Sequence, residues 1–169
     1  PTIAATMLVE HAAHRAAPGV AGSRRRPVAL LLTRQQPPTL DRAVRAPASG
    51  VARGACVLAD APHGRPDLLL LARGSEVAPC VAAGHALRFE GVEARVVSIS
   101  SWELFEQQDE AYREQVLPRA VTARVAVEQG AAFGWERWVG LSGKVIGMRT
   151  FGASAPLKNL LQKFGFSTE

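Results

Sequence analysis

The chain has 169 residues, of which 47% are hydrophobic and 21% charged, and its formal net charge at pH 7 is +5. This length and composition predict a globular protein with one substantial core. No run approaches the roughly 18 apolar residues of a membrane helix, and the first residues lack a signal-peptide pattern. We therefore expect a cytoplasmic protein that does not bind membranes. The positive charge would suit nucleic acid, but many arginines stand in apparent connectors without interleaved aromatic residues, so no nucleic-acid partner is expected.

The first part of the chain predicts a helix over residues 4–17 and a buried strand over residues 27–33, with the sequence PVALLLT. The stretch from residue 36 to residue 54 contains proline, glycine and arginine without a sustained apolar period, which is typical of an interdomain linker. The sequence thus divides into a short upstream unit and a longer downstream one.

From residue 55 short apolar runs alternate with longer amphipathic ones. The pattern predicts strands at residues 56–59, 67–72, 94–98, 121–127 and 144–148. It predicts helices at residues 76–90, 101–107, 110–116, 133–139 and 156–164. Strands that alternate with helices predict an α/β fold, here a three-layer αβα arrangement with a five-stranded, mostly parallel sheet.

The helix over residues 76–90 is predicted to follow the turn Arg73-Gly74-Ser75. We expect Ser75 to be its N-cap and Gly91 to end it. One face carries apolar or small residues at helical spacing: Val77, Cys80, Val81, Gly84 and Leu87. Cys56 and Cys80 have no metal-ligand spacing, and we expect two free thiols in the core in preference to a disulfide.

Other chemically suggestive residues have simpler explanations. The turn Gly74-Ser75-Glu76 opens a helix and could receive an anion, but it has neither a dinucleotide fingerprint nor a P-loop lysine, so a capped turn is favoured. Asp60, His63 and Asp67 lie near one another among prolines, where a solvated turn is favoured over a metal site.

Histidines and carboxylates elsewhere show no catalytic arrangement. His85 lies within a predicted helix and is expected to be a packing residue. The acidic residues are expected to form a solvated face: Glu103, Glu106, Asp109 and Glu110. In the aromatic segment with Phe133, Trp135 and Trp138, core positions are favoured over an interface.

Arg34 is different because it directly follows the apolar run 27–33. The carboxyl end of a parallel strand faces the crevice where open α/β sheets bind ligands, and a guanidinium can hold a phosphate through two parallel hydrogen bonds. Position alone leaves a structural ion pair and a ligand contact equally open.

Several runs together resemble the end of a transketolase. They are LLTRQ (31–35), PDLLLLARGSEV (66–77), ARVVSISSWELFEQQDEAYREQVLP (94–118), RVAVEQGAAFGWERWVG (124–140) and FGASAP (151–156). The resemblance implies that residues 1–45 are the end of the middle, pyrimidine-binding domain with a linker, and that residues 55–169 are the C-terminal domain. Both ends of the chain then look like those of a fragment.

The resemblance also implies an activity for a full-length parent: transfer of a two-carbon ketol unit between sugar phosphates, in the pentose phosphate pathway. Thiamine diphosphate and a divalent metal, Mg or Ca, would be held by upstream domains, and a homodimer is expected. The resemblance assigns Arg34 to the substrate phosphate, and it places no catalytic, cofactor-binding or metal-binding residue in this chain, which alone would be inactive.

Two other functions remain open. One is a non-catalytic module that binds an anion or a partner at the Gly74-Ser75 turn and at the carboxyl edge of the sheet. The other is a degenerate transketolase paralogue, which the unusual residues 1–26 would suit because they lack the acidic residues that the family usually has there.

Overall fold

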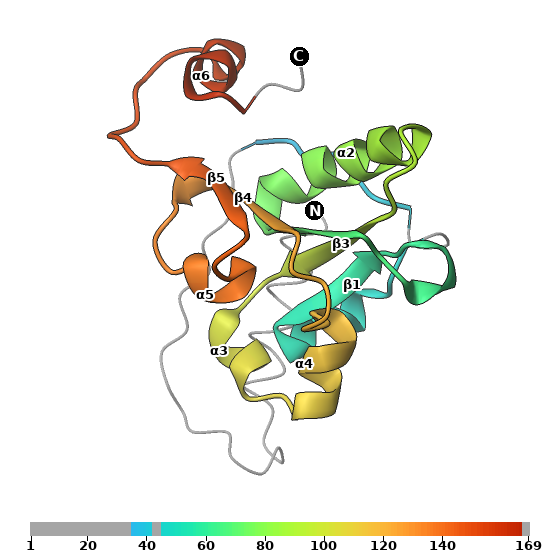
Figure 1. Cartoon of the computed structure of the whole chain (residues 1–169). Helices are drawn as coiled ribbons and strands as arrows, with labels where there is room; N and C mark the ends of the chain where they lie inside the picture. Colours follow the sequence, from blue (N-terminus) through green and yellow to red (C-terminus); the bar gives the residue numbers. More distant parts are fainter. Residues whose placement is uncertain (1–34, 42–44, 167–169) are drawn as a thin grey trace.

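The computed structural model describes residues 35–41 and 45–166 (Figure 1). The helix predicted over residues 4–17, the strand predicted over residues 27–33 and Arg34 lie outside the described residues. The fold described by the model is therefore that of the downstream unit together with part of the predicted linker.

Five strands form one sheet, as predicted. They are β1 (Ala55–Ala59), β2 (Leu68–Ala72), β3 (Ala94–Ile99), β4 (Arg124–Ala131) and β5 (Lys144–Met148). Their order across the sheet is β1-β3-β2-β4-β5. Strands β3, β2, β4 and β5 are parallel neighbours, whereas β1 pairs with β3 in the antiparallel direction at one edge. The prediction of a mostly parallel sheet is confirmed.

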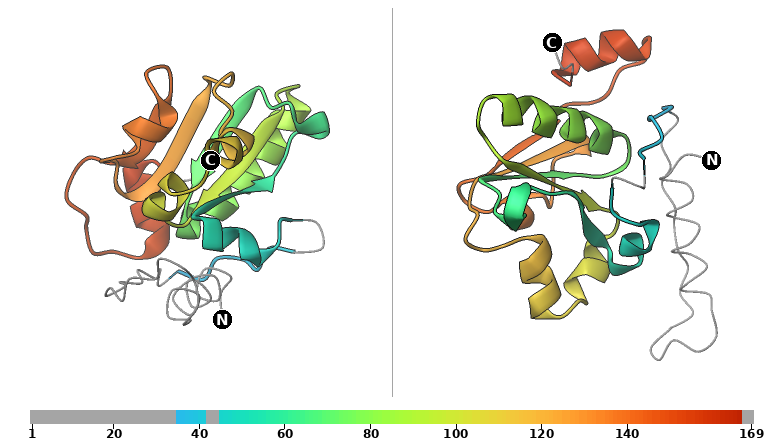
Figure 2. Two further views of the ribbon diagram at one scale, coloured as in Figure 1. Left: turned by 90° about the horizontal axis from the view of Figure 1, so that it is seen from below. Right: turned by 90° about the vertical axis from the view of Figure 1, so that its right-hand side faces the viewer.

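Helices cover both faces of the sheet and give the predicted three layers (Figure 2). Helix α2 (Val77–Phe89) lies on one face. Helices α3 (Trp102–Glu106), α4 (Glu110–Val116) and α5 (Glu136–Val139) lie on the other. Helix α6 (Leu157–Phe164) follows β5, lies away from the sheet and has no fully buried residue (Figure 1).

Each face of the sheet has its own apolar core. The larger core joins β2 and β3 to α3, α4 and α5, with Phe105 and Trp135 almost completely buried. The smaller core joins the opposite sheet face to the predicted face of α2, where Cys80 is 2% exposed. Both Cys56 and Cys80 are free and buried, as predicted. The alternating faces of β2 explain why its run of four leucines is buried on both sides.

The start of α2 differs from the prediction. A 3-10 turn, η3 (Gly74–Glu76), precedes the helix, and the Ser75 hydroxyl donates a hydrogen bond to Glu76 Oε1 and makes no capping bond. Gly91 does end the helix region: it has φ of 79° and its N–H bonds to the Arg88 carbonyl. The N-cap assignment to Ser75 was therefore wrong, because Ser75 lies inside the 3-10 turn and the N-cap position of α2 is Glu76.

Two further boundaries differ for local reasons. Strand β4 begins at Arg124 because the chain turns after Pro118, with the Val121 N–H bonded to the Pro118 carbonyl. Helix α5 begins only at Glu136, since Gly134 has φ of 86°, a conformation that no right-handed helix contains.

The described part of the predicted linker packs onto the domain. Its 3-10 helix η1 (Ala48–Arg53) buries Val51, and Leu40 packs against the smaller core. Gly54 has φ of 82°, and its carbonyl accepts the N–H groups of Ser100 and Ser101 at 2.8 and 3.0 Å. Backbone hydrogen bonds therefore tie this segment to the two residues that follow β3.

Candidate functional site

The carboxyl ends of β2 and β4 lie side by side in the middle of the sheet. Strand β2 has β3 as its neighbour on one side and β4 on the other. The connection that follows β2 therefore runs to one side of the sheet, and the connection that follows β4 runs to the opposite side. In open α/β sheets such a point opens the crevice that most often binds a ligand. The side chains at this edge are therefore the first candidates for a functional site.

A buried carboxylate organises the edge. Glu128, 5% exposed, accepts hydrogen bonds from Arg73 Nε at 2.5 Å, from Trp135 Nε1 at 3.3 Å and from the Gly130 N–H at 2.7 Å. Three donors from separate segments thus converge on one carboxylate. The arrangement joins the ends of β2 and β4 to the segment before α5.

Glu76 is a second buried acid at this edge and is 4% exposed. Burial raises the pKa of its carboxyl, and the negative charge of Glu128 raises it further, while the Ser75 hydroxyl acts in the opposite direction. Two carboxylates beside the turn oppose a bound anion. Because Arg73 is already paired with Glu128, the Gly74-Ser75 turn offers an anion little free positive charge.

Aromatic rings surround the Arg73 side chain. Its guanidinium carbon lies 5.2 Å from the centre of the Trp102 ring, and Trp102 meets Trp135 edge to face with ring centres 5.5 Å apart. The predicted core position is confirmed for Trp135, which is 0% exposed, and is wrong for Phe133, which is 87% exposed. Trp138 is half-buried and packs against the larger core.

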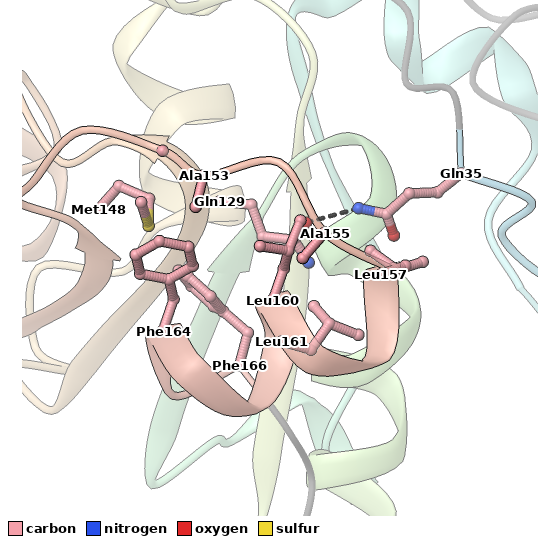
Figure 3. Close-up of a pocket in the computed structure, with 11 residues that line it drawn as sticks. Gln35, Gln129, Met148, Ala153, Ala155, Leu157, Leu160, Leu161, Phe164 and Phe166 are labelled. Carbon is pink, nitrogen blue, oxygen red and sulfur yellow. Dashed lines mark hydrogen bonds between the residues drawn. The ribbon is translucent and has the colours of Figure 1, made fainter.

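A cavity of about 520 Å³ lies between α6 and the ends of β4 and β5 (Figure 3). Its apolar wall comes from α6 and from β5, with Leu157, Leu160, Phe164 and Met148 among the lining residues. Its polar wall is a pair of amides: Gln35 Nε2 donates to Gln129 Oε1 at 2.5 Å. Gln129 belongs to β4, and Gln35 is the residue next to Arg34.

Arg34 itself lies outside the described residues, but its neighbour Gln35 is one of the residues that line the cavity. The Gln35–Gln129 and Arg73–Glu128 pairs were both missed from the sequence, since they join residues 94 and 55 positions apart. The one available signal was Glu128, an acidic residue two positions after the buried Ala126 and therefore on the same face of β4.

The loop with Asp60, His63 and Asp67 is exposed, as predicted, but its carboxylates are structural. Asp60 holds the buried Arg95 guanidinium through Nε–Oδ1 and Nη2–Oδ2 contacts of 2.7 and 3.0 Å. Asp67 Oδ2 accepts the Glu93 N–H at 2.9 Å. No group of three or more His, Cys, Asp or Glu residues that could hold a metal ion occurs among residues 35–41 and 45–166.

His85 is exposed and was wrongly expected to be a packing residue; its Nε2 lies 2.9 Å from Arg45 Nη2. The acidic residues of α3 and α4 are exposed, as expected, and several of them have local structural contacts. Asp109 accepts the Tyr112 N–H and caps α4, and Glu106 pairs with Arg137 at 2.7 Å. In the described part of the chain, no helix has the length and apolarity needed to cross a membrane.

The part of the chain that is similar to known proteins includes this edge of the sheet. The sequence model of the family described as "Transketolase-like TK C-terminal domain" matches residues 54–167. The transketolase of Halalkalibacterium halodurans is 50% identical over 147 residues, which are 87% of this chain and 22% of that protein. Transketolase 1 of Escherichia coli is 51% identical over 143 residues, 85% of this chain and 21% of that protein.

Solved structures agree. A transketolase from Leishmania mexicana has a TM-score of 0.63 and 42% identity over 70% of this chain and 17% of that one. A transketolase from Pichia stipitis in complex with sedoheptulose-7-phosphate has a TM-score of 0.65 and 29% identity over 73% of this chain and 18% of that one. The chain spans about a fifth of the length of these relatives. A match of 147 residues in a chain of 169 leaves at most 22 residues before it, so the match also includes Arg34 and Gln35.

Proposed function

Because the chain belongs to the transketolase family, we propose that it is the C-terminal part of an enzyme that transfers a two-carbon ketol unit between sugar phosphates. The observation that supports this most is 50% identity to a curated transketolase over 87% of the chain, upstream segment included. Since the chain spans about a fifth of such relatives, we propose that further domains supply the rest of the enzyme.

In this proposal Arg34 binds the phosphate of the substrate. A guanidinium presents parallel N–H donors that match phosphate oxygens, and its charge persists at all physiological pH values. The resemblance of the run Thr33-Arg34-Gln35 to the family's phosphate-contacting run supports the role. Among the described residues that line the cavity beside Gln35, none is a cation.

Thiamine diphosphate and its divalent metal belong to upstream domains in this proposal. Transketolases in general use this cofactor as an electron sink for carbon–carbon bond chemistry. The described residues do not fit the metal, because they contain no suitable group of acidic, histidine or cysteine ligands. We derive no step of the reaction through the cofactor from this chain, whose share of the work is to bind phosphate and to support neighbouring domains.

A chimeric enzyme tests the proposal. The upstream domains of the Halalkalibacterium halodurans transketolase are joined to this chain, and steady-state rates are measured with a phosphorylated and an unphosphorylated ketose donor. We expect ketol transfer in the chimera. A chimera that is folded and loaded with thiamine diphosphate, yet inactive, would refute the activity and favour a degenerate paralogue.

The substitution Arg34→Ala in the same chimera tests the arginine. Losing hydrogen bonds to a charged group costs about 1.5–3 kcal/mol, which raises KM for the phosphorylated donor roughly tenfold to a hundredfold. Arg34→Lys keeps the positive charge but loses the paired N–H donors of the guanidinium, so its KM for the phosphorylated donor should lie between those of the unsubstituted chimera and Arg34→Ala. A similar change in KM for both donors would sink the assignment.

We further propose that the full enzyme is a cytoplasmic homodimer. Large apolar side chains lie open on this chain, among them Phe133, Leu141 and Phe151, which are 87%, 108% and 99% exposed. Exposed groups of this size are what contact with further domains or a second subunit would cover. Light scattering of the chimera measures the assembly, and a monomer at micromolar concentration would contradict the proposal.

A further inference from the structure

Gln129 connects the sheet to the residue beside Arg34. Its side-chain oxygen accepts the hydrogen bond from Gln35 Nε2 at 2.5 Å, across 94 positions of sequence. Figure 3 shows the bond spanning from the end of β4 to the chain segment that carries Gln35. The bond is part-buried, at the wall of the cavity beneath α6.

The backbone that carries Gln129 is irregular and firmly held. Glu128 pairs with Gly147 of β5 and Ala131 pairs with Met148, so β4 has extra residues at this point and the ladder contains a bulge. Bulges redirect side chains and recur beside functional sites. The bulge places Gln129 outside the regular ladder.

Close packing leaves the bulge little freedom. A Cβ atom at Gly130 would lie 2.9 Å from Glu128 Oε1, and one at Gly147 would lie 2.9 Å from the Ala132 Cβ. The buried Glu128 carboxylate on one side of Gln129 is itself held by three donors. The amide of Gln129 is therefore presented from a rigid support.

A fixed Gln35 restricts its neighbour. One peptide bond joins Gln35 to Arg34, and successive Cα atoms are about 3.8 Å apart, so a bond that anchors Gln35 acts on the residue directly beside the proposed phosphate-binding arginine. A guanidinium that binds phosphate through two parallel bonds depends on such placement, because misplacement of about 1 Å is costly.

We propose that Gln129 is a positioning residue for Arg34 and acts through Gln35. This inference rests on the proposed phosphate-binding role of Arg34. Gln129 does not touch the substrate in this scheme. Its effect is confined to substrates that carry the phosphate.

The test uses the chimeric enzyme and the variant Gln129→Leu, which removes the acceptor. We expect KM for the phosphorylated donor to rise about threefold to tenfold, the range for one lost neutral hydrogen bond, with kcat and the KM for the unphosphorylated donor unchanged. Gln162→Leu is the matched control, since Gln162 is exposed on α6 and does not line the cavity, and it should leave both KM values unchanged.

Gln35→Leu removes the donor of the same bond and serves if Gln129→Leu does not fold. The double variant should raise KM no more than the larger single effect, because both substitutions remove the same bond. Additive effects, or an equal rise in KM for both donors, would overturn the inference. If Arg34→Ala discriminates between the donors and neither glutamine variant does, only this inference fails; if Arg34→Ala does not discriminate, the phosphate role fails with it.

Discussion

The buried guanidinium of Arg95 gives the sharpest test of what holds this domain together. Its side chain is 6% exposed and that of Asp60 is 39% exposed. Besides its two contacts with Asp60, it donates to the Gln115 carbonyl at 2.7 Å and to the Gly64 carbonyl at 3.3 Å. The substitution Asp60→Ala removes the only anion on this charge among the described contacts and leaves two neutral acceptors.

The expected cost depends on the burial of the charge that remains. Removing one partner of a buried ion pair costs about 3–5 kcal/mol because the other charge stays buried and uncompensated. Since the Asp60 side chain is partly open to solvent, water can reach the vacated place, and we expect about 3 kcal/mol, the lower end of that range. Asp60→Asn keeps an oxygen acceptor and removes only the charge, so its cost should be smaller.

Urea unfolding of this chain, followed by circular dichroism, measures the effect. With an m value of about 2 kcal/mol/M, a loss of about 3 kcal/mol lowers the midpoint by about 1.5 M. Arg119→Ala is the control, because the Arg119–Glu110 pair is 74% and 68% exposed and should be worth less than about 1 kcal/mol. If Asp60→Ala cost no more than Arg119→Ala, the reasoning from burial would be refuted.

Three other predictions rest on local geometry and burial. Gly54→Ala should abolish folding, because a Cβ there would lie 2.4 Å from backbone atoms at φ of 82°, whereas Gly91→Ala, with φ of 79° and open space, should cost only about 1 kcal/mol in urea unfolding. Glu76→Gln should raise the free energy of unfolding more at pH 7 than at pH 4. Burial raises the pKa of the Glu76 carboxyl above its ordinary value of 4.5, so the protein with Glu76 loses stability as the pH rises above 4.5, whereas the Glu76→Gln variant does not. Burial raises the pKa of Cys80 to about 12, so this thiol should react with a disulfide reagent at pH 8 only after unfolding, and rapid labelling of the native chain would contradict that.

The sheet could be predicted because its information is local. Each strand is a short apolar run with a turn on either side, and burial on both faces makes such runs nearly continuous, as in the leucines of β2. The α2 face was predictable for the same reason, since Val77, Cys80 and Val81 repeat at helical spacing. The antiparallel direction of β1 was not predicted, because direction depends on the path of the chain between strands.

Site residues depend on contacts that local sequence does not encode. Ser75 is a good N-cap by residue type, yet it lies inside the 3-10 turn Gly74–Glu76, where its hydroxyl donates to the buried Glu76 carboxylate. Phe133 and Trp135 are both large and apolar and stand two residues apart, but only Trp135 lies under the sheet edge. Gly134, with φ of 86°, lies between them and keeps both outside α5, so a helical pattern could not separate the buried residue from the exposed one.

The end of β4 contains two polar residues whose partners differ in a way that bears on function. Glu128 is satisfied entirely within the domain, by Arg73, Trp135 and the Gly130 N–H, so the crevice between β2 and β4 has used its charged groups for structure. Gln129 instead bonds to a residue upstream of the matched C-terminal domain. At the end of β4 the charge of Glu128 is therefore already paired, and the Gln129 amide bonds to a segment outside the domain. This arrangement fits a strand end that supports a neighbouring binding residue better than one that binds a ligand itself. Substitutions in the Glu128 cluster should therefore change stability first, whereas substitutions in the glutamine pair should change phosphate recognition first.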